Sequence, residues 1–144
     1  MGPQKFKVVF DANIYLSFFL TSGETIAAIF EAWQNNIFEV YASSEIITEI
    51  KRVFFYPKLQ KYLTKNDRNK MLLLLDRIVK KIYPSEKIEF IRDPEDAIYL
   101  EAAQACKADY LVSGDKDLLD LKKIGKTLII SPKEFLVVII IREK

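Results

Sequence analysis

Residues 93–121 read DPEDAIYLEAAQACKADYLVSGDKDLLDL, which predicts a helix, a strand and an acidic turn in direct succession. Asp93 is a preferred helix-capping residue, and the proline after it fits the first turn of a helix. We expect this helix to end near Lys107, before the strand-like apolar run at residues 109–113 (DYLVS). The Gly-Asp pair that follows is a turn signal. The chain therefore contains a helix–strand unit that ends on the carboxylate of Asp115.

The rest of the chain repeats this alternation of helix and strand. Further strands are expected at residues 5–10 (KFKVVF), 37–41, 87–91 (KIEFI) and 127–130. Helix starts are expected at Thr21-Ser-Gly-Glu24, at Ser43 or Ser44, at Thr64-Lys-Asn-Asp67 and at Ser131-Pro-Lys-Glu134. Such alternation favours an α/β fold with a mainly parallel sheet and helices on both faces. The length of 144 residues fits a single domain, residues 1–144.

Two apolar segments have their own predictions. The helix that begins at Thr64 is expected to run to about Ile82 and to be ended by Pro84. Its buried stripe is expected to comprise Leu72, Leu73, Leu75, Ile78 and Val79. Residues 135–141 are all apolar, and three structures suit them: a buried helix end, an extra strand or a dimer surface.

The chain has no histidine and one cysteine, Cys106, and this composition excludes several classes of catalytic site. It rules out a Ser-His-Asp triad, a Cys-His pair, an intramolecular disulfide and a Cys-based zinc site. Enzymatic chemistry would rest on carboxylates, lysine, hydroxyls or a cofactor, and oxygen ligands favour Mg²⁺ or Mn²⁺. No apolar run reaches the roughly 18 residues of a membrane span. With no signal peptide visible, we expect a cytoplasmic protein without membrane contact.

Four acids stand where a parallel sheet would gather them. Asp11 directly follows the first strand, and Asp115 follows the fourth. Asp96 lies in the first turn of the helix after the third strand, and Glu49 about two turns into the helix after the second. The carboxyl ends of parallel strands form the usual ligand site of such sheets. Clustered carboxylates repel one another, and a divalent cation would relieve that repulsion.

Each acid also has an ordinary structural explanation. Asp11 suits the cap of a helix that begins directly after it, and Asp96 suits the third helical position of a capping box. Asp115 follows a glycine, as turn residues often do. Glu49 can pair with solvated neighbours, and Glu45, on the same helix face, is a rival for its role.

Four blocks of sequence resemble, in order, the motifs of the PIN-domain family, above all its toxin-like branch of VapC-like ribonucleases. They are KVVFDANIYLSFFL, ASSEIITEIKRVFFYPKL, RDPEDAIYLEAAQACKADYLVSGDKDLLDL and IISPKEFL. The resemblance covers nearly the whole chain, and the third block is its most specific part. It implies a five-stranded, mainly parallel sheet flanked by helices on both faces, and Mg²⁺- or Mn²⁺-dependent cleavage of RNA.

The resemblance also implies roles for single residues. The catalytic acids would be Asp11, Glu49, Asp96 and Asp115, and the metal ligands among them Asp11, Asp96 and Asp115. Asn13 would orient Asp11 or a bound water, Ser113 keeps the hydroxyl of a threonine frequent there, and Asp117 would be an outer acid. The chain departs from the family in DAN, where DTN is common, and in a long basic segment. The second departure leaves substrate and partner open.

The basic segment, residues 51–81, holds ten Lys or Arg and two Asp, whereas the whole chain has a net charge of only +2. Its cations are interleaved with Phe54, Phe55, Tyr56 and Tyr62, of which we expect the two phenylalanines in the core. Cations neutralise phosphates and exposed aromatics stack on bases, whereas the alternative is a solvated helix face. The candidate RNA-binding residues are Lys51, Arg52, Lys58, Lys61, Lys65, Arg68 and Lys70.

These features together favour a metal-dependent endoribonuclease that cleaves single-stranded or structured RNA by metal-activated water. The resemblance implies the toxin of a toxin–antitoxin pair, with RNA as substrate and an antitoxin and a second copy of the chain as candidate partners. One alternative is a non-catalytic RNA-binding or interaction module that retains the fold. Another is a phosphotransfer domain with Asp11 as nucleophile, although its pattern calls for a second Asp where Asn13 stands.

Overall fold

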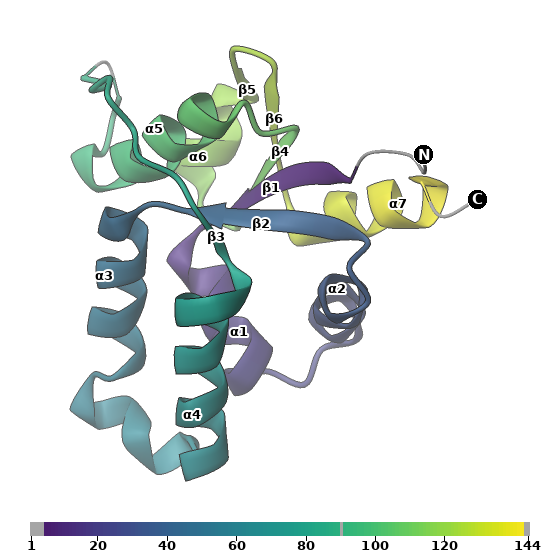
Figure 1. Cartoon of the computed structure of the whole chain (residues 1–144). Helices are drawn as coiled ribbons and strands as arrows, with labels where there is room; N and C mark the ends of the chain where they lie inside the picture. The colour runs from purple at the N-terminus through teal and green to yellow at the C-terminus, as the bar shows by residue number, and fades with distance from the viewer. Residues whose placement is uncertain (1–4, 90, 143–144) are drawn as a thin grey trace.

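A sheet of six strands lies at the centre of the molecule, with the strands in the order β3-β2-β1-β4-β6-β5 (Figure 1). The computed structural model describes residues 5–89 and 91–142. The strands are β1 (Phe6–Phe10), β2 (Phe38–Ala42), β3 (Lys80–Lys81), β4 (Tyr110–Val112), β5 (Lys123–Ile124) and β6 (Thr127–Ile130). Every neighbouring pair is parallel except β5 and β6. The expected α/β fold with a mainly parallel sheet is confirmed, with six strands in place of five.

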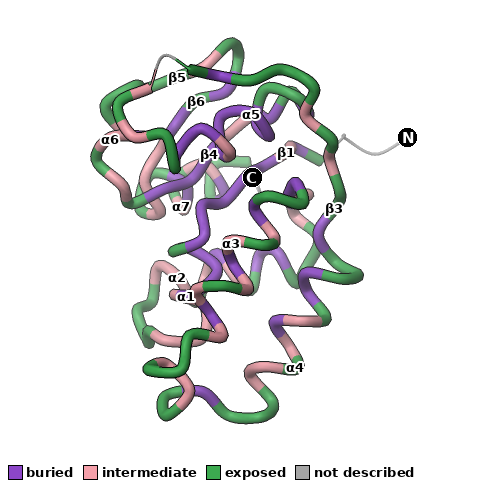
Figure 2. The backbone as a smooth tube through the Cα atoms, turned by 90° about the vertical axis from the view of Figure 1, so that its left-hand side faces the viewer, coloured by how far each residue is buried: buried purple, intermediate pink, exposed green. Residues whose placement is uncertain are grey.

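Helices cover both faces of this sheet. They are α1 (Ala12–Leu20), α2 (Glu24–Gln34), α3 (Ser44–Phe54), α4 (Lys65–Leu73), α5 (Ala97–Cys106), α6 (Lys116–Leu121) and α7 (Pro132–Arg142). Figure 1 shows α5 and α6 on one side of β1 and β2, with α1, α2 and α4 on the other. Because neither face meets water, Val8, Val9 and Phe10 of β1 are fully buried, as is typical of parallel strands. Figure 2 shows this buried centre and the exposed end of α4.

Aromatic rings fill the core between the sheet and helices α2 and α7. Phe10 packs edge to face on Trp33 and Phe135, with ring centroids 5.8 and 6.1 Å away. Phe38 of β2 lies 5.1 Å from Phe135. Burial of such rings contributes more than area alone, because their edges meet the faces of their neighbours. Phe135 therefore fixes α7 to the sheet.

A helix begins at or near each of the four predicted starts, and the predicted cap is correct at three of them. Ser43 caps α3, Thr64 forms a reciprocal capping box with Asp67, and Ser131 exchanges two hydrogen bonds with Glu134 at α7. The box at Thr21 is absent, because residues 12–20 form a helix of their own. The Thr21 hydroxyl instead donates to the Ser17 carbonyl at the end of α1, at 2.9 Å. Gly23 precedes α2 without a side-chain cap.

The segment between α4 and α5 departs most from the prediction. Helix α4 ends at Leu73, a π-helical turn (Leu74–Ile78) follows, and β3 then pairs with β2, so no helix reaches Ile82. Leu75 and Val79 are buried as predicted, but Leu73 and Ile78 are exposed because the helix is interrupted. The strand expected at residues 87–91 is absent from residues 87–89 and 91, and Phe90 lies outside the described residues. The Ile88 N–H donates to the Glu101 carboxylate, at 2.9 Å, instead of to a strand.

The apolar run near the end of the chain forms most of helix α7. Phe135 and Ile139 are buried, whereas Val137, Ile140 and Ile141 on the same helix are exposed. The run is therefore a partly buried helix and not an extra strand, and the dimer surface stays a prediction. In residues 5–89 and 91–142, no helix is both long enough and apolar enough to cross a membrane.

Replacing Phe135 with Ala should lower the free energy of unfolding by about 3–5 kcal/mol, because the ring is fully buried and its removal leaves a cavity. The matched control is Ile141→Ala on the same helix, which should change stability by less than about 0.5 kcal/mol, since Ile141 is 67% exposed. Urea unfolding followed by circular dichroism measures both. Equal losses in the two variants would contradict this packing.

Candidate active site

The pairing of β1 with β4 brings two predicted residues side by side. Phe10 and Val112 are partners in the parallel register, so the residues after them, Asp11 and Ser113, leave the sheet at the same edge. The Asp11 N–H continues the ladder by donating to the Val112 carbonyl, at 3.2 Å. The expected convergence at the carboxyl ends of the strands therefore starts from backbone hydrogen bonds.

A cavity of about 210 Å³ opens at this edge, and all four predicted catalytic acids line it. The residues around it are Asp11, Ala12, Asn13, Glu49, Val53, Asp93, Glu95, Asp96, Tyr99 and Asp115. They come from four parts of the chain: the start of α1, the middle of α3, the start of α5 and the start of α6. Asn13 also lines the cavity, as its predicted role requires. Ser113 and Asp117 are not among the lining residues.

Asp11 is held on both of its carboxylate oxygens. Oδ1 accepts from the Ile14 N–H at 3.1 Å, so Asp11 caps α1, and Oδ2 accepts from the buried Ser113 hydroxyl. The Ser113 oxygen in turn accepts from the Asp115 N–H at 2.9 Å, and Asp115 caps α6 through Leu118. The capping explanation of Asp11 is therefore correct. Asp115, for which a turn was the structural alternative, also caps a helix, and both acids line the cavity. Ser113 acts from behind the cavity, as the bridge between them.

Asp96 is the acid of this cavity that has a buried carboxylate oxygen without a hydrogen-bond donor within the described residues. It is 9% exposed, and the oxygen without a donor is Oδ2. Asp93 caps the 3₁₀ turn at Pro94–Asp96 by accepting from the Glu95 N–H at 3.0 Å. No hydrogen bond among the described residues joins the Asp96 carboxylate to the Asp93 N–H, so the capping box considered for Asp96 is absent. Burial raises the pKa of Asp96 to about 7, with a contact to Asp115 as the next cause. Burial also raises the pKa of Asp11, against the hydrogen bond from Ser113.

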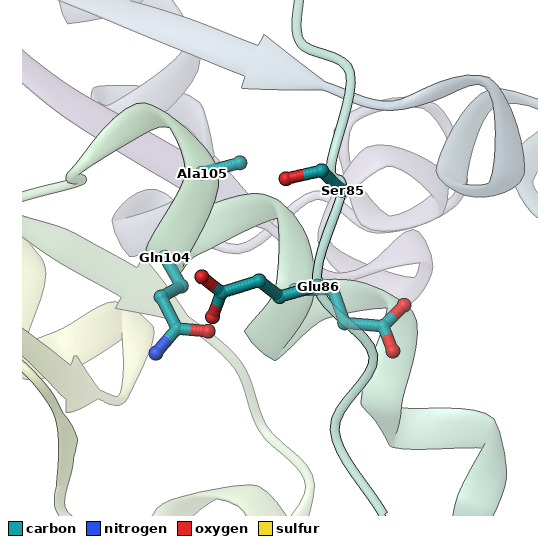
Figure 3. Close-up of a pocket in the computed structure, with 5 residues that line it drawn as sticks. Ser85, Glu86, Gln104 and Ala105 are labelled. Carbon is teal, nitrogen blue, oxygen red and sulfur yellow. The ribbon is translucent and has the colours of Figure 1, made fainter.

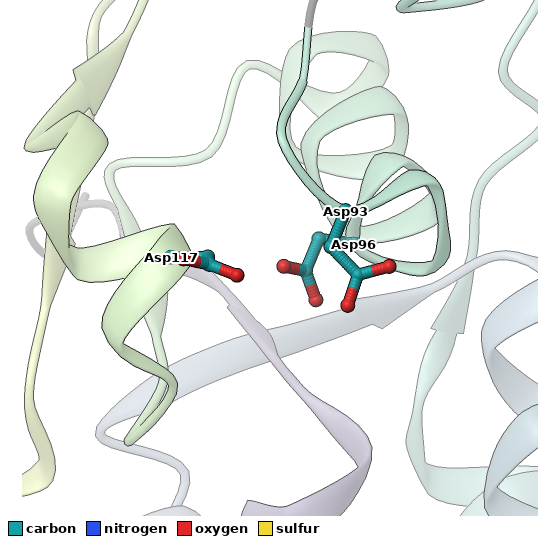
Figure 4. Close-up of side chains that lie close together, drawn as sticks. All are labelled: Asp93, Asp96 and Asp117. Carbon is teal, nitrogen blue, oxygen red and sulfur yellow. The ribbon is translucent and has the colours of Figure 1, made fainter.

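Asp96 also belongs to a second group of acids, beside those that line the cavity. One oxygen from each of Asp93, Asp96 and Asp117 lies within 4.8 Å of the others. In Figure 4, Asp117 on α6 faces the two acids at the start of α5. However, Asp117 Oδ1 already accepts from Arg92 Nη1 at 2.8 Å. Asp117 is therefore close to the cavity, but a guanidinium partly neutralises its charge.

The structure distinguishes between Glu49 and Glu45, the two candidate acids on α3. Glu49 lines the cavity, but Glu45 is exposed beside it and bonds to the Ser44 hydroxyl. That hydrogen bond lowers the pKa of Glu45. Glu49 is bound by Arg52 of the same helix, with Nη2 to Oε1 at 2.5 Å and Nε to Oε2 at 3.2 Å. The acid nearest to Asp11 and Asp96 on α3 is therefore Glu49.

The carboxylates of this cavity fit a hard divalent cation. Among the described residues, Asp11, Asp96 and Asp115 form no ion pair with Lys or Arg. Buried carboxylates without a counter-charge are costly, and here one of their oxygens also lacks a hydrogen-bond donor. Oxygen ligands of this kind suit Mg²⁺ or Mn²⁺. These three acids are the ones that would hold such an ion.

Two further residues near the cavity were not predicted. The Tyr99 hydroxyl accepts from the Ala12 N–H at 3.3 Å and so joins α5 to the start of α1. Its position three residues after Asp96, on the same helix face, was a usable signal. Arg92 bonds to Asp117 from a distance of 25 residues along the chain. No spacing rule predicts such a contact.

The basic segment is partly engaged with the protein itself. Lys51 lies 3.9 Å from Asp76, Arg52 binds Glu49, and Arg68 donates to the Leu63 carbonyl. Lys58, Lys61 and Lys65 are exposed, and so are Tyr56 and Tyr62, whereas Phe54 is buried in the core. Lys70 stacks on the Phe30 ring. RNA contact by this segment stays a prediction.

Another cavity, of about 330 Å³, lies between the segment after β3 and helix α5. Ser85, Glu86, Glu101, Gln104 and Ala105 line it (Figure 3). None of the predicted site residues is among them. Glu101 is buried here and accepts the Ile88 N–H, which ties the segment to α5. This cavity therefore contains two carboxylates, those of Glu86 and Glu101, and the second is already bonded to the backbone.

Comparison with known proteins gives three kinds of match. Residues 7–117 match the family model described as PIN domain. The uncharacterized protein MJ1680 of Methanocaldococcus jannaschii is 32% identical, over 94% of this chain and 93% of that protein. PAE2754 from Pyrobaculum aerophilum has a TM-score of 0.63 at 18% identity, covering 97% of this chain and 99% of its own. VapBC2 from Rickettsia felis, bound to a DNA fragment from their promoter, has a TM-score of 0.58 at 16% identity, covering 88% and 98%.

Metal-free protein should lose stability as pH rises from about 4 to about 7, because Asp96 keeps its proton over this range only in the folded chain. Asp96→Asn removes this titration. The variant should therefore be roughly 1–3 kcal/mol more stable than the parent at pH 8 and similar to it below pH 4. Urea unfolding in EDTA at both pH values measures the difference. A parent that is the more stable protein at pH 8 would contradict the assigned environment of Asp96.

Proposed function

The chain belongs to the PIN domain family, whose members are generally nucleases, and from this premise we propose that it is an endoribonuclease that requires Mg²⁺ or Mn²⁺. Its substrate is single-stranded or structured RNA. The observation that carries the proposal is the cavity in which Asp11, Asp96 and Asp115 meet. Within residues 5–89 and 91–142 none of the three has a basic partner, and Asp96 has a buried oxygen without a hydrogen bond. A site of this charge is unfavourable unless a cation belongs there.

The cation would be held by Asp11, Asp96 and Asp115. When bound, a divalent cation polarises the phosphodiester and lowers the pKa of water. The protein supplies the geometry: Ser113 and the Ile14 N–H fix Asp11, and the cap on α6 fixes Asp115. Asp96 gives up its proton when the site is loaded, because a positive charge opposes the effect of burial on its pKa.

Glu49 and Asn13 would act on the attacking water from the α3 and α1 sides of the cavity. Glu49 is placed to accept a proton, and the Asn13 amide can both donate and accept a hydrogen bond. Attack by water on the phosphodiester leaves a 5′-phosphate and a 3′-hydroxyl. Because the cavity is acidic, RNA needs positive charge nearby. Six residues would supply it: Lys51, Arg52, Lys58, Lys61, Lys65 and Arg68.

We further propose that the chain acts in the cytoplasm as the toxin of a toxin–antitoxin pair. Support comes from its structural similarity to VapBC2 of Rickettsia felis, a complex described as bound to its own promoter DNA. The partner would be an antitoxin protein. A homodimer is also proposed, since α7 carries exposed apolar side chains at Val137, Ile140 and Ile141.

Purified protein should cleave single-stranded RNA with Mn²⁺ or Mg²⁺ and lose that activity in EDTA. Asp11→Asn and Asp96→Asn should each reduce kcat by at least about 100-fold, because each removes a charge from the cation site. Glu24→Gln is the matched control and should retain full activity, because Glu24 is an exposed acid at the start of α2 that does not line the cavity. RNA binding without cleavage by the wild-type chain would instead support the non-catalytic module. Activity that survives in both Asp variants would contradict the site.

Ser113→Ala should lower activity by about 10- to 100-fold while Asp11 is still present, because the hydroxyl orients that carboxylate. Ser113→Thr keeps the hydroxyl and should retain most of the activity. The ratio of the two rates, with unfolding free energies as a check on folding, measures the role of the hydrogen bond. Equal losses in both variants would assign the effect to packing.

A further inference from the structure

Five of the acids in and beside the cavity divide into two classes by their partners. Asp11, Asp96 and Asp115 form no ion pair among the described residues, as shown above. Glu49 and Asp117, which lie farther out, each bind an arginine: Arg52 and Arg92 respectively. We call Asp11, Asp96 and Asp115 the inner acids and Glu49 and Asp117 the outer acids. The inner acids are available to a metal cation, whereas each outer acid is already paired with a guanidinium.

The two arginines stand on different sides of the inner acids. Arg52 is on α3, which follows β2, and Arg92 reaches α6, which follows β4. Strand β1, which delivers Asp11, lies between β2 and β4 in the sheet. The paired arginines therefore lie on either side of the carboxyl end of β1: Arg52 on α3 itself, and Arg92 in the segment before α5, bound to Asp117 of α6.

The surface next to the cavity extends toward Arg52. A shallow groove of about 540 Å³ shares Glu49 and Glu95 with the cavity, and Ser44, Glu45, Thr48, Arg52 and Ile98 complete its lining. Arg52 is the cation in this lining, beside three glutamates. A polynucleotide strand whose phosphodiester sits at the inner acids would continue along this groove on one side. On the other side, it would meet Arg92.

We propose that Arg92 is a phosphate-binding residue that, with Arg52, grips the RNA backbone on both sides of the cleaved bond. Glu49 and Asp117 hold the two guanidinium groups in place until RNA arrives. This inference rests on the proposed function, and it adds to it a residue and a reason for cleavage inside a strand. A strand gripped on both sides of the reacting phosphate must continue past it in both directions.

The strength of the ion pairs permits this exchange. The Arg52 and Arg92 side chains are 67% and 69% exposed, and exposed pairs contribute little to stability. A guanidinium matches a phosphate with two parallel hydrogen bonds, as it does a carboxylate. Asp120, 3.8 Å from Arg92, also binds Lys116 at 2.8 Å, so Asp117 is the stronger partner that Arg92 must leave. Replacing a carboxylate by a phosphate costs Arg92 no hydrogen bond.

The test is binding of a fluorescein-labelled single-stranded RNA to the full chain, with Asp11→Asn present throughout to prevent cleavage. Fluorescence anisotropy is recorded with Mn²⁺ across about 50–200 mM salt. Arg92→Gln should weaken binding about tenfold and reduce the salt slope by about 0.7, the value for one phosphate contact on a single strand. Arg92→Lys keeps the charge and should restore the slope. The matched control is Lys126→Gln, which breaks an exposed pair with Asp109 away from the cavity and should change neither quantity.

A separate titration of the otherwise wild-type chain with Mn²⁺ alone tests the competing role. If Arg92 only neutralises Asp117, Arg92→Gln will tighten Mn²⁺ binding and leave the salt slope of RNA binding unchanged, which overturns the proposal. A slope that matches that of Lys126→Gln, or absence of RNA binding by the Asp11→Asn chain, also overturns it. Because these readouts need no cleavage, an inactive wild-type chain would refute the nuclease proposal without deciding this one.

Discussion

Parallel pairing of β1 with β4 is the constraint on which the site depends. It aligns Phe10 with Val112, so that the next residues, Asp11 and Ser113, meet through a buried hydrogen bond. The Ser113 oxygen then accepts the Asp115 N–H, which sets the start of α6. Two acids that are far apart in sequence are thus held by one hydroxyl. A shift of this register by one residue would turn the side chains of the shifted strand to the other face of the sheet, separate Asp11 from Ser113 and dismantle the cavity.

The clustering of buried acids at this edge of the sheet destabilises the metal-free chain. Asp11 and Asp96 are almost fully buried, and burial raises the pKa of both. The folded chain tolerates them because a large aromatic core around Phe10 and Phe135 stabilises the sheet that carries them. The unfavourable negative charge is therefore concentrated at one edge of the sheet. A bound cation there would make the contribution of these acids to stability favourable. This separation of core and site is typical of enzymes, in which function is retained at some cost in stability.

Features that depend on position relative to a strand end were predictable from the sequence. The convergence of Asp11 and Asp115 followed from the strands that end before them, and the capping boxes at Thr64 and Ser131 followed from local sequence. Asp96 lines the same cavity although the strand expected directly before it is absent from the described residues. Features that depend on competition between distant partners were not predictable. The edge of β2 captures residues 80–81 and ends the helix early, and the Glu101 carboxylate takes the N–H that a strand at residues 87–91 would have used. In both cases tertiary contacts override local apolar pattern.

Burial explains why identical carboxylates have different partners at this site. Asp11 and Asp96 are 4% and 9% exposed, so water screens them little and a mobile side chain cannot reach them. The Glu49 and Asp117 side chains are 32% and 31% exposed, where long arginine side chains can approach from solvent and leave again. Charge interactions weaken with this exposure, so the outer pairs can exchange while the inner group stays fixed. An acidic cavity with arginines beside it can therefore attract a cation to its centre and a polyanion to the surface next to it. Within the described residues, the lining of the cavity contains no basic side chain.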